Sequence, residues 1–492
     1  MMRSSVVTSI VTLLAASLFG CVTYSSTDAS NRTQPLPRSA LSVTPDYALS
    51  QVESSTVTTI DAKHTYSLDE LIALAQHNNP ATRIAWQEAE QAATAAGMVK
   101  ATYLPMLSAS VLGGYQRSKR HTQSELTNLP LDVEIDTTNH SHISGIVPAL
   151  TMEWLLFDFG KRAALQSAAK ELATASRVKF TGAHQAVIFN VSRTFFEYSA
   201  ARENTKLAAQ HLENSLNLTN AAQARFRHGV ATSIEVAQAK QLAAQAKLAK
   251  VQTKGVEQDA YQALLSAIGL PPTAEIQIAD TQGRTLPHFS ELPNDELLKE
   301  ALAYRPDLLA VDAARKAAEK GVDSAQANYM PKVALLGVAA SGNANFNLRG
   351  VGEMSPHSSS QAILLGVTLP LFDGGLRRMQ VQEAESRAMA AQELVRKTQQ
   401  DALKEMHFAV NALRSALEAY EAASELVEAA TLTHDAAQEA YKVGVGNMML
   451  ATQAANGLLD AAQAKSLAYA GALIASANLA FMMGQMNQAP AS

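Results

Sequence analysis

Cysteine, aromatic residues and a charge of one dominant sign are all scarce in this chain of 492 residues. A single Cys excludes a disulfide framework and cysteine-based metal sites. Aromatic residues make up 5% of the chain, whereas the hydrophobic fraction is 47% and comes largely from Ala, a composition that favours long, closely packed helices. The formal net charge of −5 gives no electrostatic basis for binding nucleic acid.

Long apolar runs and the familiar enzyme motifs are also missing. Beyond residue 21 no uninterrupted apolar run reaches about 18 residues, so we expect no transmembrane helix, and an exported protein could then cross a membrane only as a closed β-barrel. There is no His-Glu-x-x-His, no phosphate-binding glycine loop and no Gly-x-Ser-x-Gly. We therefore expect no enzyme activity, no cofactor and no metal site. The pairs Met448-Met449 and Met482-Met483 could in principle bind Cu(I), but packing is the ordinary role of Met.

The single Cys, Cys21, ends a segment typical of an export signal. A positively charged start precedes an apolar stretch at 6–18 that is too short to span a bilayer. The four residues ending at Cys21, Leu-Phe-Gly-Cys, resemble a bacterial lipoprotein signal, in which residues 1–20 are removed and Cys21 is acylated. An ordinary secretory signal with a chance Cys is the alternative. Residues 21–64, rich in Ser, Thr and Pro, are expected to form an irregular lipid-anchored arm.

Several short motifs occur twice, in the same order. Two proline pairs recur at a constant offset in the numbering (306−80 = 331−105 = 226): Asn79-Pro80 as Arg305-Pro306, and Leu104-Pro105 as Met330-Pro331. Two glycine motifs recur at a smaller offset (372−157 = 444−229 = 215): those at 157–160 and 226–230 return at 372–375 and 441–445. The copies therefore differ by one deletion, whose length is the difference between the offsets (226−215 = 11), and each should be one structural unit. We expect a first repeat at 65–270, a linker at 271–292, a second repeat at 293–485 and a tail at 486–492.

Each copy is expected to begin with a helix followed by a hairpin of strands. Ser67 and Glu70 form a capping box for the first helix, which should break near Pro80 and end before Pro105; Asn294 should cap the second copy. Alternating apolar residues then predict strands at 107–115, 146–156, 333–339 and 363–369, with polar loops at 116–141 and 342–360. Pro148 should kink its strand or place it at an edge.

A very long helix and a returning helix complete each copy. The predicted long helices, 160–228 and 375–443, span roughly 100 Å each at about 1.5 Å per residue. Each long helix begins at a corner that follows the preceding strand. The Asp and Gly residues of these corners are ordinary turn residues: Asp158, Gly160, Asp373, Gly374 and Gly375. A heptad seam follows Leu403, Met406, Val410, Leu413, Leu417 and Tyr420, matched in the first copy by Ile188, Val191, Phe195 and Tyr198. Returning helices at 232–268 and 447–484 should pack antiparallel on the long ones.

Two hairpins supply only four strands per chain, too few to close a barrel, since bacterial barrels begin at about eight strands. An open edge in lipid would leave backbone groups unpaired. The chain must therefore assemble with further copies of itself. Three copies would give twelve strands, and two or four copies would also leave no backbone edge unpaired.

This order of motifs, present twice, resembles the TolC family of outer-membrane efflux and secretion ducts over about residues 66–485. The resemblance implies a mainly α, α+β fold. Long antiparallel helical hairpins would form a periplasmic α-barrel, and four strands per chain would contribute to a twelve-stranded outer-membrane β-barrel in a homotrimer. It also implies a periplasmic adaptor and a proton-driven inner-membrane pump as partners. An acylated Cys21 resembles the lipid anchor of the family branch that serves tripartite efflux. Members of that branch would conduct small molecules passively to the exterior. The alternatives are the outlet of a type I protein secretion system and, less favoured, a periplasmic coiled-coil scaffold without a pore.

The resemblance also implies two functional sites in this chain, an adaptor-contact surface and a periplasmic gate. Contact with the adaptor would fall on the turns at the periplasmic tip: Phe226, Gly229, Val230, Tyr441, Gly444 and Val445. The periplasmic gate of family members that resemble TolC itself uses a Tyr, an acidic residue, an Arg and Asp rings. Tyr441 and Glu235 occupy the first two positions, but Gly446 replaces the Arg, and Leu450 and Gln453 replace the Asp residues. Met448, Met449 and Leu450 are therefore expected to close the pore by apolar packing, unless they face neighbouring helices.

Overall fold

The computed structural model describes most of the chain from residue 61 onward. The described residues are 61, 63–126, 133–281, 284–348, 352–354 and 357–486. The expected signal at 1–20, the acylated Cys21, nearly all of the arm at 21–64 and all but the first residue of the tail at 486–492 lie outside them.

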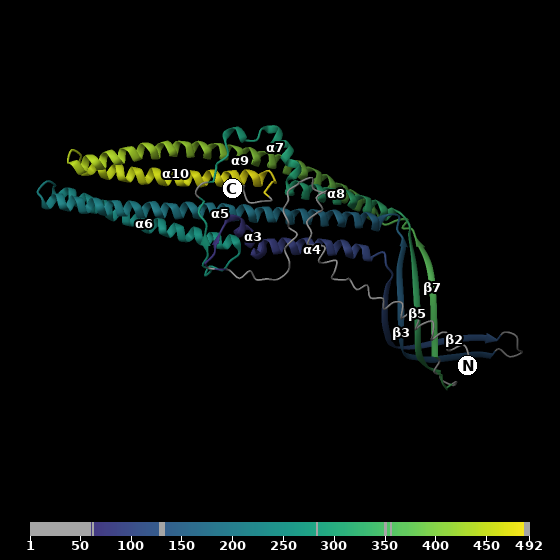
Figure 1. The fold of residues 1–492 in the computed structure, drawn as a ribbon. Coiled ribbons are helices and arrows are strands. Elements are labelled where there is room, and N and C mark those ends of the chain that lie inside the picture. Colours follow the sequence, from purple (N-terminus) through teal and green to yellow (C-terminus); the bar gives the residue numbers. More distant parts are fainter. Residues whose placement is uncertain are drawn as a thin grey trace. The chain divides into compact units, whose positions relative to one another are not determined.

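Apart from one additional short strand in the second half, helices and strands follow the same order in the two halves of the chain (Figure 1). The first half contains α3 (Leu68–Asn78), α4 (Pro80–Ala101), β2 (Met106–Leu126), β3 (Val133–Phe157), α5 (Lys161–Arg227) and α6 (Ser233–Ile268). The second contains α7 (Asp295–Ala301), α8 (Pro306–Gln326), β5 (Lys332–Leu348), β6 (Gly352–Met354), β7 (His357–Thr368), α9 (Leu376–Val443) and α10 (Met448–Met482). Short 3-10 helices lie at Phe289–Glu291, Leu302–Tyr304 and Ala327–Tyr329. The predicted mainly helical fold is confirmed.

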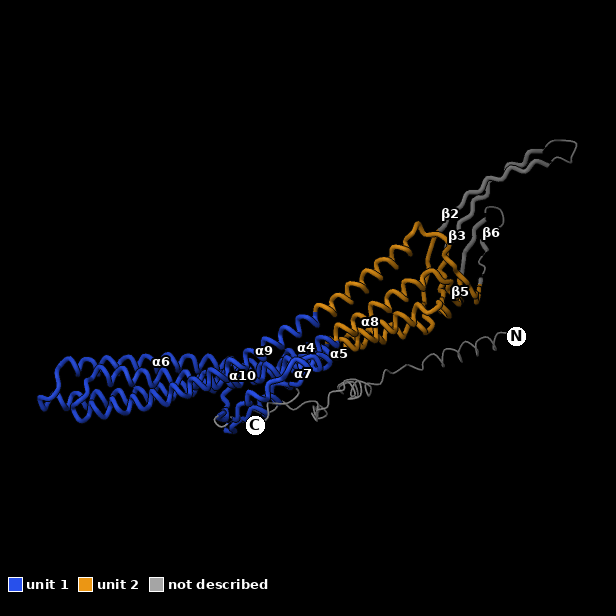
Figure 2. The backbone as a smooth tube through the Cα atoms, turned by 90° about the horizontal axis from the view of Figure 1, so that it is seen from above, with its two compact units in different colours: residues 1–87, 177–309, 398–492 blue, residues 88–176, 310–397 orange. Residues whose placement is uncertain are grey.

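The chain divides into two compact units, shown in different colours in Figure 2. One unit comprises residues 1–87, 177–309 and 398–492, and the other comprises 88–176 and 310–397. Each unit takes segments from both halves of the chain. The helices α4, α5, α8 and α9 contribute residues to both units.

Caps and prolines start the helices where the sequence predicts. Ser67 donates its backbone N–H to Glu70 Oε2 at 2.8 Å and its side chain accepts from the Glu70 N–H, which completes the capping box of α3. Asn294 Oδ1 accepts a backbone N–H of the first turn of α7 at 2.9 Å. Pro80 and Pro306 are each the first residue of a helix, where a proline removes no helical hydrogen bond.

The long helices bury the predicted seam in the first unit. Met406, Val410, Leu413 and Leu417 of α9 lie in one core cluster with Ala472, Ala475 and Leu479 of α10. Ile188, Val191 and Phe195 of α5 lie in another with Leu264, Leu265 and Ile268 of α6. The seam prediction is confirmed, because these seam residues are buried in packed clusters. Burial of each Val, Leu, Ile, Phe or Met side chain among them stabilises the fold by about 1.5–3 kcal/mol. Among the described residues, none of the helices combines the length and the hydropathy of a membrane-spanning segment.

Matching glycines end the two returning helices against the opening helices. Gly269 has φ +84°, and its counterpart in the second copy, Gly484, has φ +70°. A Cβ would lie 2.9 Å from the Asn78 carbonyl oxygen at Gly269, and 2.6 Å from the Tyr304 carbonyl oxygen at Gly484. Both the left-handed backbone and the close approach therefore require Gly.

The residues before the two opening prolines hold these same helix ends. Asn79 Nδ2 donates to the Ala267 carbonyl oxygen at 2.8 Å. Arg305 Nη1 donates to the Met482 carbonyl oxygen at 3.2 Å, and Arg305 Nη2 pairs with Glu405 at 2.8 Å. The repeated Asn-Pro and Arg-Pro motifs thus both start a helix and satisfy the last carbonyls of another.

The strands of the second unit form one antiparallel sheet in the order β2-β3-β5-β7, with β6 also beside β5. β3 lies between β2 and β5, so Pro148 is not on an edge strand, and that alternative is wrong. The pairing of β3 with β5 stops after Ile146 and resumes at Ala149, because proline has no N–H to donate. A parallel pair of two-residue strands, β1 (Thr65–Tyr66) and β4 (Gln277–Ile278), was not predicted.

The predicted polar loops are shorter than expected. β2 continues to Leu126 and β3 begins at Val133, so the prediction of a loop over 116–141 is wrong. The prediction of a loop over 342–360 is also wrong, because β5 reaches Leu348 and β6 and β7 occupy much of the remainder. Both predictions relied on the end of apolar alternation. The hydrogen bonds of a strand ladder join backbone groups, so the strands continue through polar sequence.

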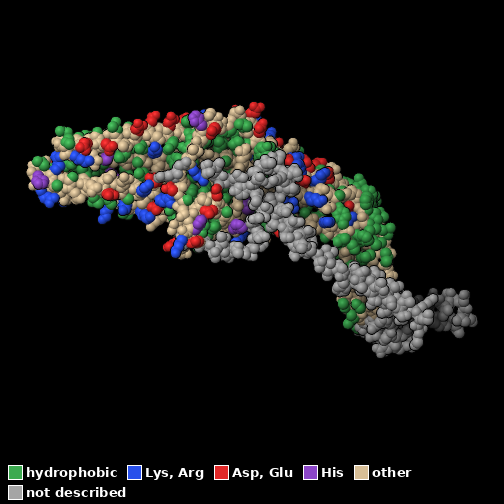
Figure 3. Space-filling model, in the orientation of Figure 1, with side chains coloured by type: hydrophobic (Ala, Val, Ile, Leu, Met, Phe, Trp, Pro, Cys, Tyr) green, Lys and Arg blue, Asp and Glu red, His purple; other side chains and the backbone are tan. Residues whose placement is uncertain are grey.

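Apolar side chains are exposed on the sheet near the corners. They include Val111, Leu112, Tyr115, Ile146, Leu150, Ile363, Leu364, Leu365 and Val367. Figure 3 shows hydrophobic side chains gathered over this part, whereas charged side chains of both signs are scattered over the helices. Exposed apolar patches of this kind mark contacts with another surface.

Candidate functional site

The two predicted turns each end a long helix with a left-handed glycine. Gly229 has φ +74° and Gly444 has φ +86°. In both turns the residue after the glycine donates its N–H, at 3.0 Å, to the carbonyl five residues earlier, which closes the last helical turn. The predicted helix ends are confirmed. We call residues 218–239 and 440–453, where α5, α6, α9 and α10 begin or end, the tip.

Most side chains predicted to contact an adaptor are exposed at the tip. Phe226, Val230 and Val445 are exposed, the last at 83% of its possible area. Tyr441 differs, because only 1% of its area is exposed. It packs with Ala222, Ala239, Met448 and Ala451 in a small core of its own. Within one chain, Tyr441 is therefore a core residue of the tip and is not exposed for contact with a partner.

Glu235 and Tyr441, the two predicted gate residues that match the family pattern, lie together. The Tyr441 hydroxyl donates to Glu235 Oε2 at 3.4 Å. Glu235 also completes a capping box: its Oε1 accepts the Thr232 backbone N–H at 3.3 Å, and its own N–H reaches Thr232 Oγ1 at 3.2 Å. Burial, followed by the negative charge of Glu235, raises the pKa of the Tyr441 hydroxyl.

The other predicted gate residues separate into buried and exposed positions at the start of α10. Asn447 caps this helix by accepting the Leu450 N–H at 2.8 Å. Met448 is buried in the tip core, whereas Met449, Leu450 and Gln453 are exposed. Only the last three of these side chains are free to line a space outside the chain.

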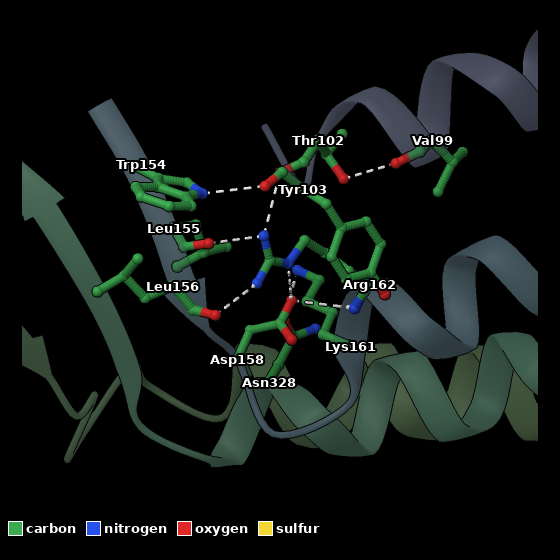
Figure 4. A network of polar contacts seen from close by, with 10 residues as sticks. All are labelled: Val99, Thr102, Tyr103, Trp154, Leu155, Leu156, Asp158, Lys161, Arg162 and Asn328. Atoms are coloured by element: carbon green, nitrogen blue, oxygen red, sulfur yellow. Dashed lines mark hydrogen bonds and ion pairs between the residues drawn. The ribbon is translucent and has the colours of Figure 1, made fainter. Parts of the chain in front are cut away.

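The corner at the start of α5 holds a polar network in the second unit (Figure 4). Arg162 Nε and the Arg162 backbone N–H both donate to Asp158 Oδ2 at 3.0 Å. The same guanidinium donates to the carbonyl oxygens of Leu155 at 2.7 Å, Thr102 at 3.1 Å and Leu156 at 3.2 Å. It lies 4.5 Å from the Tyr103 ring centroid. Strand β3, the segment directly after α4 and helix α5 are thereby joined at one buried ion pair.

The second corner repeats this arrangement. Arg377 Nε donates to Asp373 Oδ2 at 2.6 Å, and Nη1 donates to the Pro370 carbonyl oxygen at 2.6 Å. Its guanidinium lies 5.1 Å from the Tyr329 ring centroid. The hydrogen bond from Arg377 holds the pKa of the Asp373 carboxyl below its usual value. Pro370 stands at the position of the second copy that matches Leu155, so matching arginines bind matching carbonyls.

Sequence reasoning found the corner aspartates but missed their arginines. A signal existed, since Arg162 and Arg377 each follow their Asp by four residues and stand at matching positions of the two copies. Arg225, which contacts Tyr441, was also missed, and the repeat offers no signal for it because Ala440 stands at the matching position. In the described part of the chain, no three His, Cys, Asp or Glu side chains are grouped to hold a metal ion.

Comparison with known proteins covers both halves of the chain. A family model described as outer membrane efflux protein matches residues 71–270 and 297–485. Protein CyaE of Bordetella pertussis is 27% identical over 331 residues, which are 67% of this chain and 65% of CyaE, so the match spans just under two thirds of that relative. The pyoverdine export outer membrane protein OpmQ of Pseudomonas putida is 25% identical over 388 residues, 78% of each protein.

A solved structure shares the fold. The Campylobacter jejuni CmeC outer membrane channel superimposes with a TM-score of 0.69 at 20% identity, over 90% of this chain and 92% of that one.

Proposed function

This chain belongs to the outer membrane efflux protein family, and from that premise we propose that it is the exit duct of a tripartite efflux system. In this role it conducts small molecules passively from an inner-membrane pump and a periplasmic adaptor to the exterior. The observation that carries the proposal is the family match itself, which covers both halves and therefore both helical hairpins and both pairs of strands. The name of the relative OpmQ, a pyoverdine exporter, supports small molecules as cargo.

The sheet supports assembly with further copies of the chain, and we propose three copies. Its outer strands are β2, of 21 residues, and β7, of 12 residues, and each leaves one backbone edge without a partner strand in the described sheet. Long open edges invite pairing with further strands. Three chains joined edge to edge would close a twelve-stranded barrel in the outer membrane, with the exposed apolar side chains turned to lipid.

The tip is the surface that we assign to the adaptor. Phe226, Val230 and Val445 expose apolar side chains around the two glycine turns, and burial of such a patch against a helical partner is favoured over its exposure to water. At the other end of the duct, acylation of Cys21 would add a lipid anchor in the outer membrane.

Met449 and Leu450 are the candidates for an apolar constriction at the periplasmic end. Replacing both with Ser should raise single-channel conductance in planar bilayers severalfold, because a polar lining stays wet where an apolar one expels water. Leu467→Ser is the matched control: Leu467 is also exposed on α10, and roughly 25 Å further along at about 1.5 Å per residue. Unchanged conductance in the double variant, or an equal rise in the control, would contradict the constriction.

Deleting the gene in its own host tests the duct function directly. Cells should accumulate a lipophilic fluorescent dye severalfold more than the parent, because the pump loses its outlet, and the intact gene should restore the parental level. Fractionation should place the chain in the outer membrane as a trimer. Normal dye efflux with loss of a secreted protein would favour the type I secretion outlet, and a soluble monomer would favour a scaffold without a pore.

A further inference from the structure

Arg225 of the first hairpin, α5–α6, makes two contacts with Tyr441 at the end of α9, besides the bond between Tyr441 and Glu235. Arg225 Nη1 donates to the Tyr441 carbonyl oxygen at 2.7 Å, and the guanidinium carbon lies 4.9 Å from the Tyr441 ring centroid. Arg225 Nη2 lies 3.5 Å from the carbonyl oxygen of Val230 in its own turn. Arg225 thus contacts both turns of the tip, and its partner lies 216 residues away in sequence.

The second turn has no room to supply such a contact itself. A Cβ on Gly446 would lie 2.9 Å from the Tyr441 backbone nitrogen and 3.0 Å from the Ala440 carbonyl carbon. The N–H groups of Gly446 and Val445 both donate to the Ala440 carbonyl oxygen, at 2.8 and 3.0 Å. The turn is therefore closed tightly on its own backbone and leaves no room at position 446 for a side chain that could reach the other hairpin. The Tyr441 hydroxyl bonds Glu235, and the guanidinium that contacts both turns comes from Arg225 of the other hairpin.

Arg225 is held incompletely. Its Nε is buried without a hydrogen-bond partner, although Nη1 and Nη2 have carbonyl partners. A buried donor without a partner favours any state in which it reaches water. The contact therefore holds the two hairpins together, while Nε would gain hydrogen bonds to water if the hairpins separated.

We propose that Arg225 is a positioning residue that fastens the α5–α6 hairpin to the α9–α10 hairpin at the tip in the closed state. Separation of the hairpins breaks its bond to the Tyr441 carbonyl, hydrates its Nε and frees the start of α10, which carries Met449 and Leu450. This role rests on the proposed duct function.

Conductance and tip distance together test this role. Arg225→Ala in the full chain should raise the ratio of open to closed channel about tenfold, the effect of losing one charged hydrogen bond. Arg225→Lys, which retains the charge but not the planar fork, should fall between it and the native chain. Arg227→Ala is the matched control, because Arg227 is exposed two residues away. It should leave the ratio unchanged.

A second measurement does not depend on conduction. Spin labels are attached at Val230→Cys and Val445→Cys in a Cys21→Ser background, which removes the single native Cys. Pulsed electron paramagnetic resonance then measures the distance between the two turns. Arg225→Ala should lengthen and broaden the distances, while Arg227→Ala should not. Unaltered distances would overturn the proposal, even if Arg225→Ala lowers the melting temperature. Lengthened distances in a chain that conducts no ions would instead retain the role of Arg225 and reject the duct.

Discussion

Arg162→Ala is expected to lower the free energy of unfolding by about 3–5 kcal/mol, the usual effect of removing one partner of a buried ion pair. Asp158 and Arg162 are each only 6% exposed, so the carboxylate would stay buried without its guanidinium. The carbonyl oxygens of Thr102, Leu155 and Leu156 would lose a donor in the same step. Denaturant unfolding of the purified chain, followed by circular dichroism, measures the loss.

The second corner provides graded controls. Arg377→Ala should lower stability less, because the Asp373 side chain is 25% exposed against 7% for Asp158 and water can replace the lost bond. Arg378→Ala should have no measurable effect, since Arg378 is exposed next to the pair. Equal losses at Arg162 and Arg378 would show that the corner network does not stabilise the fold.

Gly484→Ala should destabilise the chain by about 2–5 kcal/mol. The left-handed backbone at φ +70° contributes about 1–2 kcal/mol for a residue with a Cβ. The overlap of that Cβ with the Tyr304 carbonyl oxygen, 2.6 Å away, adds about 1–3 kcal/mol, because backbone cannot move aside as a flexible side chain can. The melting temperature and the denaturant midpoint should both fall.

Gly374→Ala separates the two contributions. Gly374 has a similar φ of +67°, but a Cβ there would meet no atom within 4 Å. Its substitution should therefore show only the backbone strain, about 1–2 kcal/mol. If the two variants lose the same stability, close approach to the opening helix does not matter at Gly484.

Local chemistry explains what could be predicted from the sequence. The capping box at Ser67, the prolines at 80 and 306 and the glycines at 229 and 444 act within one turn of chain, so the elements that they start or end lie where expected. The seam through Met406 and Val410 was visible for a related reason, since helical period places those residues on one face.

Contacts between distant segments explain what could not be predicted. Strand β2 extends to Leu126 through pairing with the backbone of β3, which apolar alternation does not report. Arg162 binds carbonyls of β3 and of the end of α4, and Arg225 binds the carbonyl of Tyr441, so neither partner has a side-chain signature in the sequence. The family pattern placed a gate cation at position 446, where the tight turn leaves no room for a side chain.

The sequence by itself determined the duplicated order of helices and strands and the positions of the turns, because caps, prolines, glycines and periodicity act over a few residues. Only the tertiary structure decided which groups meet at the corners and at the tip. Those contacts join backbone carbonyls to guanidinium groups as much as 216 residues away, and a carbonyl is the same in every residue. Which backbone carbonyls Arg162, Arg377 and Arg225 bind is therefore decided only when the chain folds.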